Sequence, residues 1–167
     1  MNQKNKNNLN NTEDLKSYIS NIKKKIIDKQ AIKLIDDLKW IELKGISQNK
    51  LDLFPVVFTG KGKKVLLLHG FDSCFLEYRR LAPLLKMKNK LIIPDLFGFG
   101  FCPRSISHKY GFKYLMEHLN SVVSYLSNND PIGLIGASMG GALALELARQ
   151  NPNRIDKLLL LSPAGLS

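Results

Sequence analysis

Hydrophobic residues follow two different patterns along the chain, and the change between them falls near Trp40. Before that point, apolar side chains alternate with polar ones at helical spacing, at Leu15, Tyr18, Ile19, Ile22, Ile26 and Ile27. Thr12 can cap this helix, and two acidic residues follow it in the first turn. We therefore expect an amphipathic helical segment over residues 12–39. Its apolar stripe favours packing on the chain's own domain, with a membrane surface or a partner as the alternative.

After Trp40 the apolar positions form short runs typical of strands. The first two runs, WIELKGI at residues 40–46 and LDLFPVVF at residues 51–58, flank a polar segment around Ser47 to Lys50, which predicts a turn. Pro55 lies inside the second run. Because proline has no backbone N–H, we expect this strand to lack part of its ladder of hydrogen bonds.

Strands and helices then alternate to the end of the chain. Four nearly continuous apolar runs have the length of buried strands, namely KVLLLHG, KLIIPD, PIGLIGA and KLLLLSP. Helical segments are predicted between them, roughly over Phe75–Lys86, Phe112–Leu126 and Met139–Gln150. This alternation predicts an α/β fold, with a mostly parallel sheet covered by helices on both faces. The Asn- and Lys-rich residues 1–11 are expected to form a disordered tail, and residues 40–167 the α/β domain.

Composition narrows the classes of protein. The chain has 167 residues, 44% of them hydrophobic and 23% charged, as in ordinary globular proteins. It has no apolar run long enough for stable membrane insertion and no secretory signal, so we expect a cytoplasmic protein. The net charge of +11 is shared between residues 1–50 and 51–167 without a nucleic-acid motif, so no nucleic-acid partner is expected. Cys74 and Cys102 stand alone, and neither a metal site nor a cofactor is indicated.

One motif carries chemistry. Gly136-Ala137-Ser138-Met139-Gly140 matches G-x-S-x-G, and it lies between a predicted strand and a predicted helix. A sharp turn at this junction leaves no room for side chains at Gly136 and Gly140, and it exposes the serine hydroxyl near a helix N-terminus. We therefore interpret Ser138 as a nucleophile. The alternative is a serine that only caps the helix.

Two further motifs precede the serine, LLLHGFDS ending at Ser73 and PDLFGFGFCP from Pro94 to Pro103. With GASMGG they occur in the order found in the α/β-hydrolase family, which the sequence resembles over about residues 50–167. The resemblance implies that the backbone amides of Phe71 and Met139 form an oxyanion hole for a small-molecule acyl substrate. It also implies structural roles for five residues of these turns and loops, namely His69, Gly70, Asp95, Gly98 and Gly100.

The chain departs from the family pattern in the second motif. Family members commonly read D-x-P-G-x-G-x-S there, whereas this chain has Phe97 for the proline and Cys102 for the serine. We expect neither departure to touch the chemistry. The strand-to-helix turn that carries the G-x-S-x-G motif is called the nucleophile elbow. A serine at its centre argues against an epoxide hydrolase, because epoxide hydrolases use aspartate at that position. Ala137 differs from the asparagine often found there in carbon–carbon bond hydrolases, which disfavours that branch.

In this family an acid and a histidine follow the serine. Here one aspartate follows, Asp156, ahead of a strand, and no histidine does. His69, His108 and His118 all precede Ser138 and favour structural or surface roles. We therefore expect the sequence to correspond to the N-terminal portion of a hydrolase without its C-terminal strands, and these 167 residues alone to be inactive. The predicted function is hydrolysis of an ester or related acyl bond through an acyl-serine intermediate. The alternative is an inactive hydrolase-like binding or signalling module.

Overall fold

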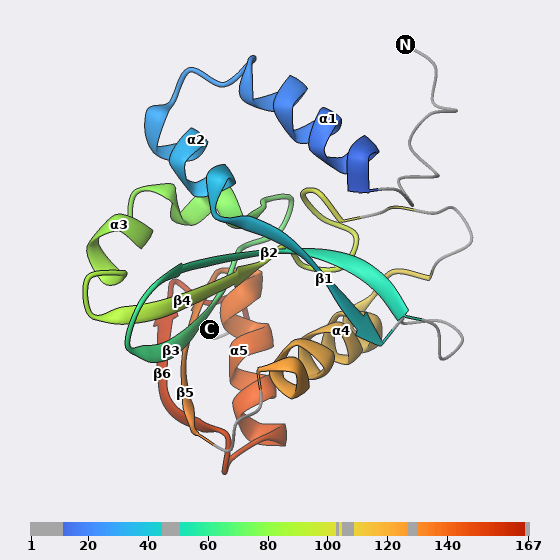
Figure 1. The fold of residues 1–167 in the computed structure, drawn as a ribbon. Helices are drawn as coiled ribbons and strands as arrows, with labels where there is room; N and C mark the ends of the chain where they lie inside the picture. The colour runs from blue at the N-terminus through green and yellow to red at the C-terminus, as the bar shows by residue number, and fades with distance from the viewer. Residues whose placement is uncertain (1–11, 45–50, 103, 105–108, 127–129, 166–167) are drawn as a thin grey trace.

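The computed structural model describes residues 12–44, 51–102, 104, 109–126 and 130–165 (Figure 1). Their strands form one sheet in the order β1-β2-β4-β3-β5-β6. The strands are β1 Leu38–Lys44, β2 Leu51–Gly60, β3 Lys63–Leu68, β4 Asn89–Pro94, β5 Ile132–Ala137 and β6 Ile155–Leu161. The helices are α1 Thr12–Lys23, α2 Lys29–Asp36, the 3₁₀ helix η2 Phe75–Arg79, α3 Ala82–Leu85, α4 Phe112–Tyr125 and α5 Met139–Gln150.

The sheet is parallel over β4, β3, β5 and β6, and antiparallel where β2 joins β1 and β4. Pro55 faces Trp40 of β1 inside this antiparallel part, and its carbonyl accepts a hydrogen bond from the Asp95 amide at 3.1 Å. In an antiparallel strand the N–H and the C=O of one residue point to the same side, and the Pro55 carbonyl points to β4. The position without an N–H therefore also faces β4, and the pairing of β4 with β2 ends at Val56. The proline therefore costs no hydrogen bond to β1.

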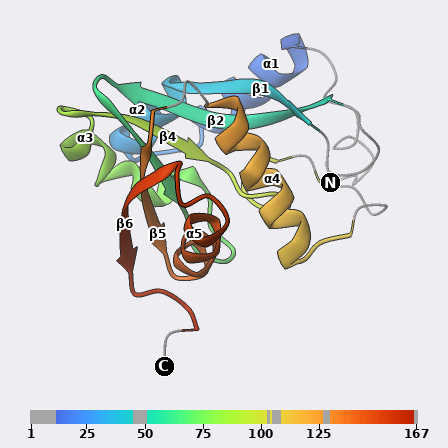
Figure 2. The ribbon, with the colours of Figure 1, turned by 90° about the horizontal axis from the view of Figure 1, so that it is seen from below.

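Both faces of the sheet are buried, as the continuous apolar runs predict. Alternate residues of one strand belong to different cores, because successive side chains of a strand point to opposite faces. In β3, Leu66 and Leu68 pack with α4 and α5, whereas Leu67 packs with α2, η2 and α3. Figure 2 shows α4 and α5 together on one side of the sheet. This confirms the predicted α/β fold with helices on both faces.

The N-terminal helical segment differs from the single predicted element. It consists of α1 and α2, and β1 already begins at Leu38. The break has a local cause, since Asp28 caps α2 by accepting hydrogen bonds from the Gln30 and Ala31 amides at 2.8 and 3.3 Å. Ile27, predicted to lie in the apolar stripe, falls in the connection and is 95% exposed. The predicted tail over residues 1–11 and the turn around Ser47 to Lys50 lie outside the described residues.

The helix predicted over Phe75–Lys86 is also divided, into η2 and the single turn of α3, which has Pro83 in its first turn. By contrast, α4 and α5 begin at the predicted residues. β6 forms one edge of the described sheet, and its leucines are largely uncovered, with Leu159 52% exposed. Among the described residues, no helix is long and apolar enough to cross a membrane.

Candidate active site

Ser138 occupies a sharp turn between β5 and α5. Its φ and ψ of 49° and −119° lie in a region that residues other than glycine rarely adopt, and its side chain is exposed. The turn is held from two directions. The Ser138 amide donates a hydrogen bond to the Leu161 carbonyl at 3.0 Å. The Ser138 carbonyl accepts hydrogen bonds from the Gly141 and Ala164 amides at 2.9 and 3.0 Å. The surrounding chain therefore fixes the serine in a strained, outward-facing conformation.

Glycines let the elements around this turn approach closely. A Cβ atom on Gly136 would lie 2.3 Å from the Gly140 carbonyl oxygen, and one on Gly140 would lie 2.1 Å from the Leu68 carbonyl oxygen. The first turn of α5 therefore packs directly on the ends of β5 and β3. As a result Gly70, in the turn after β3, comes so close that its Cβ would lie 3.3 Å from the Cβ of Ser138. Two of the sequence motifs thus meet at one edge of the sheet.

His69 is buried and both of its ring nitrogens are engaged. Nδ1 lies 2.8 Å from the Gly70 carbonyl oxygen, and Nε2 accepts a hydrogen bond from the Leu96 amide at 2.9 Å. An accepting Nε2 requires the neutral ring with its proton on Nδ1. Burial lowers the pKa of His69, which favours the same neutral form. The imidazole therefore ties the turn after β3 to the end of β4 and has no nitrogen left to take a proton from Ser138.

Asp95 organises the loop that follows β4. Its two carboxylate oxygens accept hydrogen bonds at 2.6 Å from the Phe75 and Phe101 amides. Burial raises the pKa of Asp95 to about 7, and the two amides hold it lower than burial alone would. A Cβ on Gly100 would lie 2.2 Å from a carboxylate oxygen, and Gly98 has a φ of +83°. These three residues shape the loop, and both carboxylate oxygens are engaged by backbone amides.

Neither His118 nor Asp156 is placed to complete a catalytic triad with Ser138. His118 is buried in α4, with Nε2 3.1 Å from the Asp95 carbonyl oxygen and Nδ1 without a partner. Burial lowers its pKa to about 4. Asp156 is exposed near the start of β6, which runs parallel to β5, so it lies at the opposite end of the sheet from Ser138. His108 lies outside the described residues.

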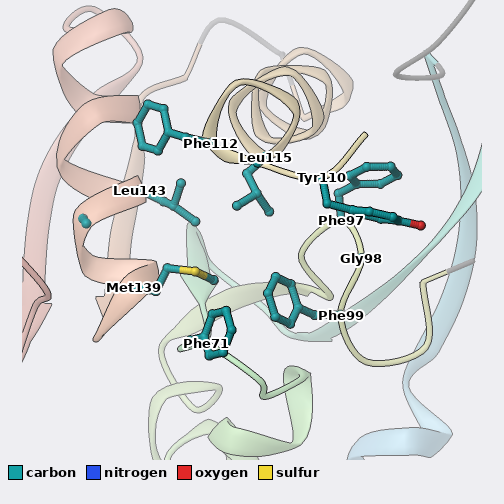
Figure 3. A pocket seen from close by; sticks show the side chains of 11 residues that line it. Phe71, Phe97, Gly98, Phe99, Tyr110, Phe112, Leu115, Met139 and Leu143 are labelled. Carbon is teal, nitrogen blue, oxygen red and sulfur yellow. The ribbon is translucent and has the colours of Figure 1, made fainter. Parts of the chain in front are cut away.

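The residues assigned to the oxyanion hole flank a cavity. Met139 is the first residue of α5, and amides in the first turn of a helix lack an acceptor within the helix. Phe71 follows Gly70 and is 73% exposed. Both side chains line a cavity of about 430 Å³, whose other walls come from the loop after β4, the start of α4 and α5, namely Phe97, Gly98, Phe99, Tyr110, Gly111, Phe112, Leu115, Ala142 and Leu143 (Figure 3).

Sequence reasoning missed this cavity and the part that Phe97 plays in it. That Phe97 does not affect the chemistry stays a prediction; its ring lines the cavity and stacks on Tyr110 with ring centroids 5.2 Å apart. Phe99 meets Phe71 edge to face at 5.5 Å. The alternation of phenylalanine and glycine in LFGFGF was the available signal. No cluster of three or more potential metal ligands occurs in the described part of the chain.

A strained, exposed serine between a parallel strand and a helix, facing a glycine turn from the neighbouring strand, defines an α/β fold of the hydrolase type. A family model for the alpha/beta hydrolase fold matches residues 63–167. The chain therefore belongs to the α/β-hydrolase fold family.

Curated relatives extend this finding. The chain is 34% identical over 111 residues to a 2-hydroxy-6-oxo-2,4-heptadienoate hydrolase of Pseudomonas putida, covering 65% of this chain and 40% of that protein. It is 34% identical over 106 residues to Lipase 3 of a Moraxella species, covering 62% and 33% of the two chains. It is 39% identical over 100 residues to the magnesium-chelatase 30 kDa subunit of Rhodobacter capsulatus, covering 58% and 34%. The chain thus spans between about a third and two fifths of these relatives.

Solved structures agree with the fold. The meta-cleavage product hydrolase CumD of Pseudomonas fluorescens superposes with a TM-score of 0.65 at 26% identity, over 75% of this chain and 45% of that one. An epoxide hydrolase of Vigna radiata superposes with a TM-score of 0.64 at 25% identity, over 75% and 38% of the two chains. Of these five proteins, four are named as hydrolases or as a lipase, and one as a magnesium-chelatase subunit.

Proposed function

We propose that the protein is a serine hydrolase that cleaves an ester or a related acyl bond through an acyl-Ser138 intermediate. The observation that carries this proposal is the conformation of Ser138. The residue is exposed, has a φ of 49° and stands against Gly70 at the carboxyl edge of the sheet. Backbone strain of this kind costs on the order of 1–3 kcal/mol and persists at sites where it serves a function.

The proposed reaction has two steps. The Ser138 Oγ attacks the acyl carbon and loses its proton to a base, and the leaving alcohol departs with a proton as the acyl-serine forms. Water then attacks the acyl carbon, which frees the acid and returns the proton to Oγ. In both steps the amides of Phe71 and Met139 stabilise the negative charge on the carbonyl oxygen.

The base is proposed to come from outside the described residues. His69 has both nitrogens engaged by the backbone, and His118 is buried against Asp95. Neither can accept the proton of an exposed serine without leaving its place. Without its base, a serine of this type loses up to about a million-fold in turnover. We therefore expect the 167-residue chain to hydrolyse esters very slowly unless a base is added.

Fluorophosphonate labelling tests the proposal, because the serine oxygen displaces fluoride from the reagent. The 167-residue chain is treated with a fluorophosphonate in imidazole buffer, and the modified residue is mapped by mass spectrometry. Ser162 is a matched control, since it is also exposed and has a positive φ of 44°. We expect labelling that is lost in Ser138→Ala and kept in Ser162→Ala. Equal labelling of both serines, or of neither, would exclude an activated Ser138.

A second candidate function is binding without catalysis. The relative in Rhodobacter capsulatus, 39% identical over 100 residues, is named as a magnesium-chelatase subunit and not as a hydrolase. For a module of this kind the elbow would be kept for its shape, and Ser138→Ala would not alter function. Failure of Ser138 to label in a folded chain would favour this alternative.

A further inference from the structure

The cavity beside the serine restricts what can be bound there. We propose that it accepts an uncharged aromatic group of the substrate, and that Phe97 and Tyr110 determine this specificity. The proposal deepens the proposed function and rests on it for the statement that the bound group belongs to an acyl substrate. The affinity of the cavity for aromatic groups does not depend on Ser138 chemistry.

The chemistry of the walls excludes charge. Of the eleven described residues that line the cavity, none carries a charged side chain, and all but Tyr110 and the two glycines present only hydrocarbon or a thioether. In Figure 3 the Tyr110 hydroxyl points away from the other labelled side chains. A charged group entering the cavity would lose water without gaining a partner from these side chains, which strongly disfavours its binding.

The wall of the cavity that Phe97 and Tyr110 form favours a planar group of the ligand. Phe97 is 4% exposed, and its ring is nearly parallel to that of Tyr110, with an angle of 25° between the ring planes. In Figure 3 this pair lies on the opposite side of the view from Met139 and Leu143. Together with Phe71, Phe99 and Phe112, they make five aromatic rings among the described residues that line the cavity. Aromatic rings gain contact energy by stacking or meeting edge to face, which a planar ligand group can do.

Gly98 permits the position of Tyr110. A Cβ atom on Gly98 would lie 2.7 Å from Cδ1 of the Tyr110 ring, so any other residue would displace the ring from the loop. The departure from proline at position 97 and the glycine at position 98 thus act together. Phe97 supplies one ring, and Gly98 leaves room for the second ring to cover it.

Binding of unreactive ketones separates this proposal from the catalytic one. The probes are 4-phenyl-2-butanone, its derivative with a carboxylate at the far end of the ring, and the aliphatic 2-octanone. Dissociation constants are measured by calorimetry with the 167-residue chain and with Ser138→Ala. We expect the phenyl ketone to bind at least about tenfold more tightly than either other probe, and equally to both proteins. Equal affinity for the carboxylate or for 2-octanone would overturn the proposal.

Variants of the cavity complete the test. Ala142→Leu fills the cavity from α5 and is expected to weaken phenyl ketone binding about tenfold or more. Ala148→Leu makes the same change on the same helix at a half-buried position that does not line the cavity, and is expected to have no effect. Phe97→Leu is expected to reduce the preference for the phenyl ketone over 2-octanone. Unchanged affinity in Ala142→Leu, or an unchanged preference in folded Phe97→Leu, would refute the proposal.

The two proposals fail in different ways. If the phenyl ketone binds as expected but fluorophosphonate does not label Ser138, the aromatic cavity stands and the hydrolase proposal fails. If Ser138 is labelled but the ketones bind without preference, only the cavity proposal fails.

Discussion

Gly140 rests directly on Leu68: a Cβ atom on the glycine would lie 2.1 Å from the leucine carbonyl oxygen. This contact joins the first turn of α5 to the end of β3, and it sets the distance between Ser138 and the turn at Gly70. Backbone cannot move away as the end of a flexible side chain could, so any residue other than glycine here must push α5 and β3 apart.

The first prediction follows from this contact. Gly140→Ala is expected to lower the free energy of unfolding by about 2–3 kcal/mol, because the added methyl group forces α5 away from β3. The measurement is urea unfolding monitored by circular dichroism. Gly133→Ala is the control, since its Cβ would make ordinary contacts, with the Val65 side chain at 3.4 Å and the Lys64 carbonyl oxygen at 3.8 Å. A loss no larger than that of Gly133→Ala would contradict the proposed packing.

Ser138→Gly separates stability from reactivity. Glycine adopts a φ of 49° without the strain that a Cβ causes. The free energy of unfolding of this variant is therefore expected to be about 1 kcal/mol higher than that of the parent chain. Ser138→Ala keeps the Cβ and should gain nothing. Both variants should lose fluorophosphonate labelling. Urea unfolding of the two variants side by side checks the prediction, and equal stabilities would show that the turn is not strained.

Two substitutions of Met139 test the role of its amide. Met139→Ala keeps the N–H and is expected to keep the rate of fluorophosphonate labelling within a few-fold. Met139→Pro removes the N–H at the first helical position, where proline is tolerated, and should slow labelling by roughly 10²–10³-fold. Circular dichroism establishes that the proline variant is folded. Equal labelling rates in the two variants would remove Met139 from the oxyanion hole.

His118 makes stability depend on pH. Its pKa is about 4 in the folded protein against 6.5 in the unfolded one, so the unfolded state binds the proton first as pH falls. The stability associated with neutral His118 is therefore present above pH 6.5 and is lost as the pH falls towards 4, by at most about 3 kcal/mol. Asp95, whose pKa is raised from 3.8 to about 7, acts in the opposite sense: the stability associated with its protonated form is present below pH 3.8 and is lost as the pH rises towards 7.

The difference between parent and variant isolates the histidine. His118→Phe retains the contact with Phe54, whose ring centroid lies 4.6 Å from the imidazole, and removes the titrating group. Urea unfolding at pH 4.5 and pH 7 is expected to show a smaller loss of stability on acidification in the variant. An equal loss in both proteins would mean that His118 titrates normally.

Local signals predicted the elbow well. Both ends of α5 agree with the sequence prediction, because the glycines, the serine and the alanine-rich run define a strand, a turn and a helix within about twenty residues. The N-terminal segment was predicted as one element because helical periodicity continues across residues 24–28. The Asp28 carboxylate caps α2 and so marks the start of a second helix. An aspartate at this position is a local signal for that start, but the helical periodicity of the apolar residues is the stronger signal.

The cavity could not be predicted in the same way. Its walls come from segments near residues 71, 97–99, 110–115 and 139–143, and the sheet order β4-β3-β5 is what brings them together. The sequence marks Phe97 only as a departure from the proline of the family pattern. Its position opposite Met139 follows from the packing of α4 against the loop after β4, which no local sequence feature specifies.

The acyl-serine intermediate is the central claim, and peptide mapping after acetylation tests it most directly. The 167-residue chain is incubated with p-nitrophenyl acetate and imidazole, digested and mapped, with the urea-unfolded chain as a reference for unselective acetylation. The account predicts acetyl-Ser138 in the folded chain only, well above the acetylation of Ser162, because only the folded chain holds Ser138 exposed in the strained turn. Acetylation of Ser138 no greater than that of Ser162, or equal in folded and unfolded chains, would contradict it.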